Sequence, residues 1–202
     1  MVRGDRKFLG ALIAIAILSA PALTGCAGEQ AAAETVPGEY PEVTLAETKS
    51  PVQFLRNDAA SRIPTAVIDT VEGTVDESVA CLEESEDPDG LIRSWHSSAL
   101  VTIVSGSAWR IEAIVDNLIQ SFTDQEWAAR SLGETVDFRS SMLTSKTSMA
   151  EIQVIGERPD PEQTEGSEAA DGEQVTVEIQ VHGPCVRTEG SGSEEVLKLE
   201  TP

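Results

Sequence analysis

The beginning of the chain constrains the rest of the molecule more than any other stretch, because it decides which part can fold and where. Arg3, Arg6 and Lys7 form a basic start, and an uninterrupted non-polar run at residues 8–18 comes next. This layout is typical of a secretory signal, and the apolar run is too short to span a bilayer. We therefore expect residues 1–25 to be a signal peptide that is removed, and the folded body to lie outside the cytoplasm.

The signal-like segment ends in the four residues Leu23, Thr24, Gly25 and Cys26. They resemble the lipobox of bacterial lipoproteins, in which an aliphatic residue and two small residues precede a cysteine. The resemblance implies that the Cys26 thiol receives a diacylglyceryl group and becomes the mature N-terminus. Each buried CH₂ of such an anchor contributes about 0.8 kcal/mol, so two or three acyl chains hold a protein firmly in the membrane. An ordinary signal cleaved near residues 31–33 is the alternative.

Composition limits the partners and predicts one covalent bridge. The formal net charge is −21, and a body this acidic is repelled by nucleic acid and by anionic lipid surfaces. We therefore expect no nucleic-acid partner, and membrane contact through the lipid on Cys26. Of three cysteines, lipidation leaves Cys81 and Cys185, which are expected to form a disulfide in an oxidising envelope. Two separate buried thiols are the alternative.

The chain divides into four parts by composition. After the signal peptide, residues 26–50 are rich in Ala, Glu, Pro and Gly and are expected to be a lipidated, disordered tether. Residues 51–188 are expected to form a single domain, since domains commonly have ~100–150 residues. Residues 189–202 are rich in Gly, Ser and Glu and are expected to be a flexible tail.

Helix signals begin this domain. Ser50 would cap a helix whose first residue is Pro51, with Phe54 turned inward and a stop or kink at Pro64. A helical spacing of apolar residues then continues to Gly73, a plausible C-terminal breaker. Residues 74–82 fit either more helix or an extended arm.

The most regular apolar stripe predicts a second helix. It covers residues 108–122, with Ser107 as its cap. A further capping pattern at residues 123–126 predicts a short helix that carries Trp127.

Four segments are expected to be strands: residues 91–104, 135–144, 148–156 and 174–182. The first strand and the helix at 108–122 should form a right-handed crossover, and the last three strands an antiparallel meander. The sequence thus predicts an α+β two-layer sandwich, with helices on one face of a roughly four-stranded mixed sheet.

The sequence contains no recognisable catalytic or metal motif. It has no G-x-S-x-G, S-x-x-K, H-E-x-x-H or Walker pattern, too few His and Cys for a zinc site, and only part of a calcium-loop pattern in the acidic turn at residues 83–90. We therefore assign no catalytic residue, metal or cofactor. His96 and His182 are expected on strand surfaces, and Trp109 is the tryptophan expected to be exposed. Trp109 and His182 are the candidate contact residues.

The whole layout resembles the short cell-envelope lipoproteins of actinobacteria. The lipobox, the tether, Trp127 after a long amphipathic helix and the Gly183-Pro184-Cys185 ending carry the resemblance. It implies a position on the extracytoplasmic face of the cell membrane and implies no activity. The first hypothesis is a non-enzymatic binding or accessory module that meets an envelope protein or a wall component. A lipid or small-ligand carrier with an apolar cavity is the alternative, and a hydrolase ranks third.

Overall fold

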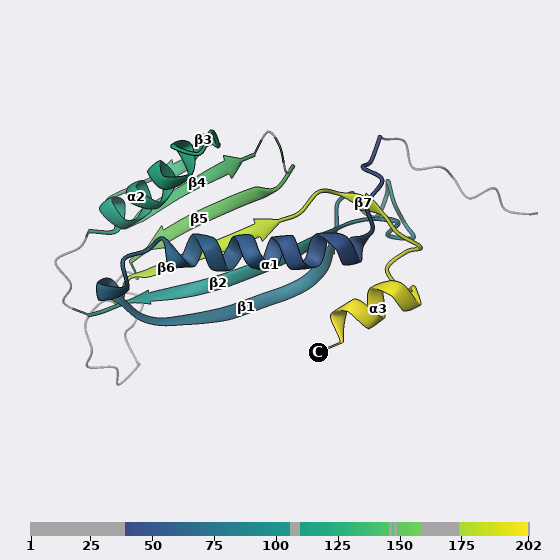
Figure 1. Cartoon of the computed structure of the whole chain (residues 1–202), viewed down its shortest axis with the longest axis horizontal. Helices are drawn as coiled ribbons and strands as arrows, with labels where there is room; N and C mark the ends of the chain where they lie inside the picture. The colour runs from purple at the N-terminus through teal and green to yellow at the C-terminus, as the bar shows by residue number, and fades with distance from the viewer. Residues whose placement is uncertain (1–38, 106–109, 146, 148, 159–173, 202) are drawn as a thin grey trace, which may run out of the picture. The chain divides into compact units, whose positions relative to one another are not determined.

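A computed structural model describes residues 39–105, 110–145, 147, 149–158 and 174–201 (Figure 1). All of them belong to one compact unit, Thr35–Pro202. The elements follow in the order α1 (Leu45–Ser61), a 3-10 turn η1 (Thr65–Val67), β1 (Ile68–Ala80), β2 (Ile92–Ile103), α2 (Ile111–Thr123), β3 (Ala128–Glu134), β4 (Phe138–Thr144), β5 (Glu151–Glu157), β6 (Thr176–His182), β7 (Val186–Arg187) and α3 (Glu194–Glu200).

The strands form one sheet in the order β1-β2-β6-β5-β4-β3, with the short β7 pairing with β2 beside this path. Every pairing is antiparallel. After β2 the chain passes through α2 to the far edge at β3, and it returns strand by strand until β6 lies against β2. The α+β class is confirmed, but the expected four-stranded mixed sheet is wrong, because the crossover joins strands that are not neighbours and the sheet has seven strands.

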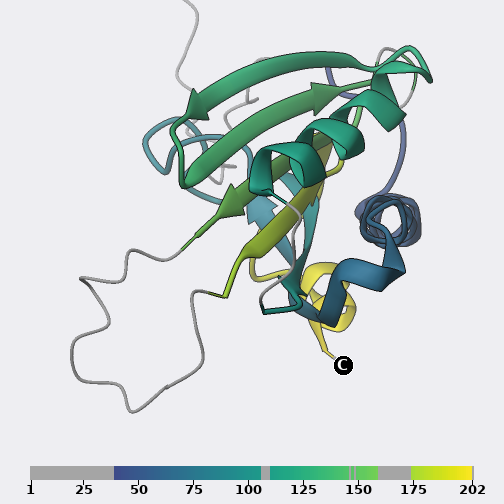
Figure 2. The same ribbon diagram turned by 90° about the vertical axis from the view of Figure 1, so that its left-hand side faces the viewer.

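The two longer helices pack on the same face of this twisted sheet (Figures 1 and 2). On α1, Arg56 Nη1 donates to Ser97 Oγ on β2 at 2.8 Å. On α2, Val115 lies so close to β5 that a Cβ added to Gly156 would stand 2.6 Å from Val115 Cγ2. The cross-strand register places Ser97 and Gly156 on one face of the sheet. The absence of a side chain at Gly156 is therefore what lets α2 approach the strands.

The core between the two layers is mainly aliphatic. The alternation expected in the last long strand is correct, since Val177, Ile179 and Val181 are fully buried. The stripe expected on the second helix is correct as well. Its buried members on α2 are Ile111, Ile114, Val115, Leu118 and Phe122. These two predictions are correct because each pattern corresponds to one complete buried face of its strand or helix.

α1 begins earlier than the sequence pattern predicted. Its N-cap is Thr44, which forms a capping box with Glu47, and Leu45 in its first turn is fully buried. Pro51, the expected first residue, lies inside the helix. The helix thus takes up the last residues of the expected tether. Two capping patterns follow each other closely here, one at Thr44 and one at Ser50. The second is followed by Pro51, a residue that is typical of the first position of a helix.

Three other local predictions are wrong. Gly73 ends no helix, because it lies within β1, next to a register shift against β2. The short helix expected around Trp127 is a turn followed by β3, and Glu126 reverses the chain there with a positive φ of 67°. α2 starts at Ile111 after Arg110 and has no side-chain cap, while Ser107 lies outside the described residues.

The last residues of the described chain contain a short helix. α3 is capped by Ser193, and its Val196 is fully buried. Lys49 Nζ of α1 donates to the Leu199 carbonyl at 2.6 Å. The Ser78 hydroxyl of β1 donates to the Glu200 carboxylate. These contacts attach the end of the chain to the first helix and to an edge strand, where a flexible tail was expected.

Candidate functional site

An apolar groove lies between α1, the residue before β3 and the β4–β5 loop. Its volume is about 430 Å³, within the range of about 300–1,000 Å³ that is typical of small-molecule sites. Glu47, Ser145 and Thr147 are among its polar lining residues. Its main apolar lining residues are Val43, Pro51, Phe54, Leu55, Trp127 and Pro184.

One flank of α1 forms a wall of this groove. Pro51, Phe54 and Leu55 are spaced i, i+3 and i+4, so they lie on the same side of the helix. The Phe54 side chain is 72% exposed, although the sequence pattern predicted it to point inward. The buried residues of α1 are instead Leu45, Thr48, Val52, Ala59 and Ala60.

The opposite flank of α1 is fixed by polar contacts, which set the rotation of the helix. Gln53 donates to the Asp76 carboxylate, and Trp95 Nε1 donates to the same carboxylate at 2.8 Å. Burial alone would raise the pKa of Asp76, but these hydrogen bonds, together with Ser97 and the charge of Lys49, outweigh it and lower the pKa. Asp76 is therefore ionised at neutral pH and holds α1 in a rotation that leaves Phe54 at the groove.

Trp127 is positioned by its contact with Phe122, which is covered in turn by Arg62. It packs edge-on against Phe122, with ring centroids 5.2 Å apart, and the Arg62 guanidinium lies 3.7 Å from the Phe122 centroid. On the other side of the groove, Gly183 lets α1 approach closely, since an added Cβ would stand 3.0 Å from Val52 Cγ2. Contacts with neighbouring residues thus fix both Trp127 and the helix α1 that line the groove.

The groove carries a fixed negative charge. The Glu47 carboxylate accepts hydrogen bonds from the Thr44 backbone N–H at 2.8 Å and from the Thr44 hydroxyl at 3.0 Å. These bonds lower the pKa of Glu47, so the carboxylate is ionised at neutral pH. An apolar group fits this lining, and a second carboxylate next to Glu47 would be repelled.

The predicted contact residue His182 lies on the face of the sheet opposite α1 and α2. Its ring stacks on His96, with centroids 4.2 Å apart and planes 7° apart. The register places Glu77 beside His96 and Glu151 beside His182, so that the four side chains form one row across four strands. The two imidazoles thus pack on each other, and no described hydroxyl or carboxylate shares a hydrogen bond with either.

Burial lowers the pKa of both histidines, because it penalises the charged form. For His96, the carboxylates of Glu77 and Glu178 act in the opposite direction but do not cancel the effect. For His182, the charge of His96 lowers the pKa further. His96 Nε2 is buried without a partner in the described part of the chain. The pair therefore favours the neutral state.

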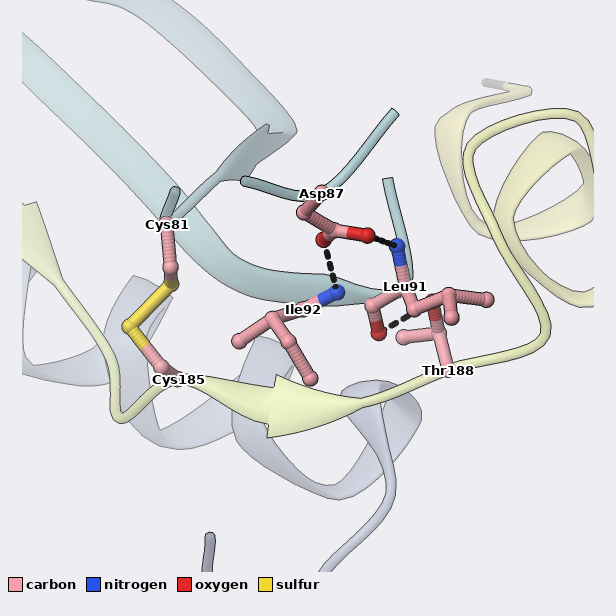
Figure 3. The surroundings of a disulfide bond; sticks show 6 residues. All are labelled: Cys81, Asp87, Leu91, Ile92, Cys185 and Thr188. Atoms are coloured by element: carbon pink, nitrogen blue, oxygen red, sulfur yellow. Dashed lines mark hydrogen bonds between the residues drawn. A yellow bond between two sulfur atoms is a disulfide. The ribbon is translucent and has the colours of Figure 1, made fainter. Parts of the chain in front are cut away.

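The predicted disulfide between Cys81 and Cys185 is confirmed, with a Cα–Cα distance of 6.1 Å (Figure 3). The acidic turn at residues 83–90 lies beside it, and its Asp87 is only 3% exposed. The Asp87 carboxylate accepts from the Leu91 N–H at 2.9 Å and the Ile92 N–H at 2.7 Å. Asp87 thus closes this turn onto the start of β2. We call this region, with Cys81, Cys185, Asp87, Leu91, Ile92 and Thr188, the disulfide corner.

The remaining predictions and comparisons add no further site. Cys26 and Trp109 lie outside the described residues. No group of three or more His, Cys, Asp or Glu suited to a metal ion occurs within those residues, and none of their helices is long and apolar enough to cross a membrane. Comparisons with models of known protein families, with curated proteins and with solved structures found no match.

The groove and its residue Phe54 were not predicted from the sequence. The sequence does indicate that Phe54 is exposed if the helix is taken to begin at Leu45. Leu45, Val52 and Ala59 then repeat every seven residues as the buried stripe, and Phe54 falls outside that stripe. Trp127 was expected on a short helix rather than at a groove, because the turn at Glu126 that precedes it has no strong sequence signal.

Proposed function

We propose that this chain is a membrane-anchored cell-envelope lipoprotein with a non-enzymatic binding module, and that the groove beside α1 is its ligand site. One observation carries the ligand site: Phe54, 72% exposed, lines an apolar groove of about 430 Å³. The anchor rests on the sequence of residues 23–26. Fully burying a large apolar side chain is worth about 1.5–3 kcal/mol. Phe54 forgoes part of this gain in the free protein, and a bound ligand would recover it.

The ligand is an apolar group, free or carried by an envelope protein or a wall component. The lining supplies carbon surface from Pro51, Leu55 and Trp127, and hydroxyls that can orient a polar end. The volume also supports the second candidate, a small-ligand carrier, since such proteins need several hundred Å³ of apolar space. The two candidates share the groove and differ in whether the ligand is part of a larger partner.

Binding in the groove can be tested with N-phenyl-1-naphthylamine, an uncharged probe that fluoresces in apolar surroundings. The wild-type protein should bind it, and Phe54→Asp should weaken the affinity about tenfold or more, a loss of about 1.4 kcal/mol. The matched control is Val136→Asp, in the turn between β3 and β4, whose side chain is 69% exposed and does not line the groove. Equal affinities for the three proteins would remove the groove from the proposal.

The anchor is tested separately. The Cys26 residue of the protein from cells should carry a diacylglyceryl mass, and the protein should partition into detergent. Cys26→Ala should abolish both. A mature N-terminus after residues 31–33 without a lipid mass would refute the anchor and leave groove binding untouched.

A further inference from the structure

We propose that the groove takes one acyl chain of the lipid that this protein itself carries on Cys26. This inference rests on the proposed function, both on the lipid anchor and on the apolar groove. It names the occupant as a part of the same molecule, which the described residues do not include. Three observations support it: where the chain enters the groove, how far the chain can reach, and the charge near the site.

The lining of the groove includes the segment that leads back to Cys26. Val43 lines the groove directly before the N-cap Thr44 of α1. Seventeen residue steps separate Val43 from Cys26. At most about 3.3–3.6 Å per residue, the connecting chain can span up to about 60 Å. An acyl chain on Cys26 can therefore reach the groove without any change in the folded body.

The charge near the groove favours this lipid over anionic amphiphiles. Glu47 in the lining is ionised, and the whole chain has a formal net charge of −21. Both features repel fatty-acid carboxylates and anionic phospholipids. The diacylglyceryl thioether on a lipobox cysteine has no charge, so it avoids this repulsion. Its covalent attachment also makes binding intramolecular, which raises its effective concentration.

The groove and the bilayer compete for the same chains. A bilayer surrounds two or three acyl chains completely, whereas the groove covers one chain against α1 and Trp127. The occupied state is therefore expected when the body is away from a bilayer, and the empty state when the anchor is inserted. In the first state, one chain and the Phe54 ring are shielded from water together.

Photocrosslinking tests the inference on the protein as cells process it. Cells that express the full chain are supplied with a diazirine fatty acid, which enters the lipid on Cys26. The purified protein is freed of detergent, irradiated and digested. Mass spectrometry should then find the acyl chain joined to the peptides that contain Phe54 or Trp127. A mixture of ¹⁵N-labelled and unlabelled protein should give crosslinks within one molecule. Crosslinks mainly between molecules, or spread evenly over the surface, would overturn the inference.

Variants and an added lipid distinguish the source of the chain. Phe54→Asp should lower the crosslink yield about tenfold or more, and Val136→Asp should leave it unchanged. Cys26→Ala protein, mixed with a diacylglycerol that carries the same diazirine, should crosslink far less at equal concentration. If it crosslinks as strongly, the groove takes lipid from outside, and the inference fails while the proposed groove function stands. A lipid mass on Cys26 without groove crosslinks has the same meaning.

Discussion

The disulfide corner and the groove differ in how they treat apolar and polar groups at the protein surface: the corner buries and pairs them, and the groove leaves them open. In the corner, a disulfide joins Cys81 to Cys185, and the buried Asp87 carboxylate accepts a hydrogen bond from the backbone of the fully buried Ile92. At the groove, Phe54 and Trp127 border open space. The corner holds the end of β1, the start of β2 and the approach to β7 together, whereas the groove leaves apolar surface that no other described residue covers. Stability and binding are thus located in different residues here, so the two can be disturbed separately.

Removing the disulfide should have the largest effect on stability. The bridge joins residues 104 positions apart in the sequence, and loss of such a bridge costs roughly 2–5 kcal/mol. The double variant Cys81→Ser with Cys185→Ser should therefore unfold at a clearly lower temperature or denaturant concentration. Below its melting temperature it should still bind the neutral probe. An unchanged melting temperature, or alkylation of both thiols in native wild-type protein, would contradict this prediction.

Asp87→Ala should have the next largest effect. It removes the acceptor of the Leu91 and Ile92 N–H groups. The hydrogen bond from Ile92 is buried, and leaving a buried donor unpaired costs about 1–3 kcal/mol. Denaturant unfolding measures the loss. Asp89→Ala is the matched control, because this neighbouring carboxylate is exposed. Equal losses for both variants would mean that loop charge, rather than the two hydrogen bonds, matters.

Mild acid should destabilise the protein through the His96–His182 pair. The pKa of both imidazoles is lowered from the ordinary value of 6.5, so the unfolded chain binds protons first as the pH falls below that value. The free energy of unfolding should decrease from pH 6.5 down to the lowered native pKa and then level off. The lowered pKa values of Glu47 and Asp76 act in a separate range, below their ordinary values of 4.5 and 3.8.

Denaturant unfolding at several pH values, with His182→Gln as the comparison, checks this expectation. The variant should lose much of the dependence below pH 6.5, because one of the two groups is gone. A wild-type dependence that persists unchanged in His182→Gln would assign the effect to other groups.

Phe54→Asp should have the smallest effect on stability, although it has the largest on binding. The side chain is 72% exposed, and exposed substitutions usually change the free energy of unfolding by no more than about 0.5 kcal/mol. Thermal unfolding should thus be close to wild type while probe affinity falls. A clear loss of stability would mean that the groove wall also supports the core, and the contrast with the corner would weaken.

Sequence patterns predicted the parts of the fold that bury one whole face. The alternation in β6 and the stripe of α2 were of this kind, and the pairing of Cys81 with Cys185 followed from the expected compartment and from the number of cysteines. The patterns failed where local signals compete, as at the two capping boxes before Pro51, or where only the tertiary structure decides, as for β1 at the sheet edge. The candidate groove was not predictable in this way, because it depends on the rotation of α1 about its axis, which Asp76 fixes from the other side.

The path of the chain through the sheet bears on how the protein reaches this structure. β2 pairs with β1, the strand directly before it in the chain, but its other edge pairs with β6, which follows much later and brings His182 beside His96. Contacts between segments so far apart form slowly, since the loop between them must close first. Until β6 arrives, β2 has an unpaired edge along residues 96–102, and such an edge can pair with other chains. If the chain is exported from its N-terminus onward, as the proposed signal peptide implies, it would be most prone to aggregation in the interval before its last long strand has emerged.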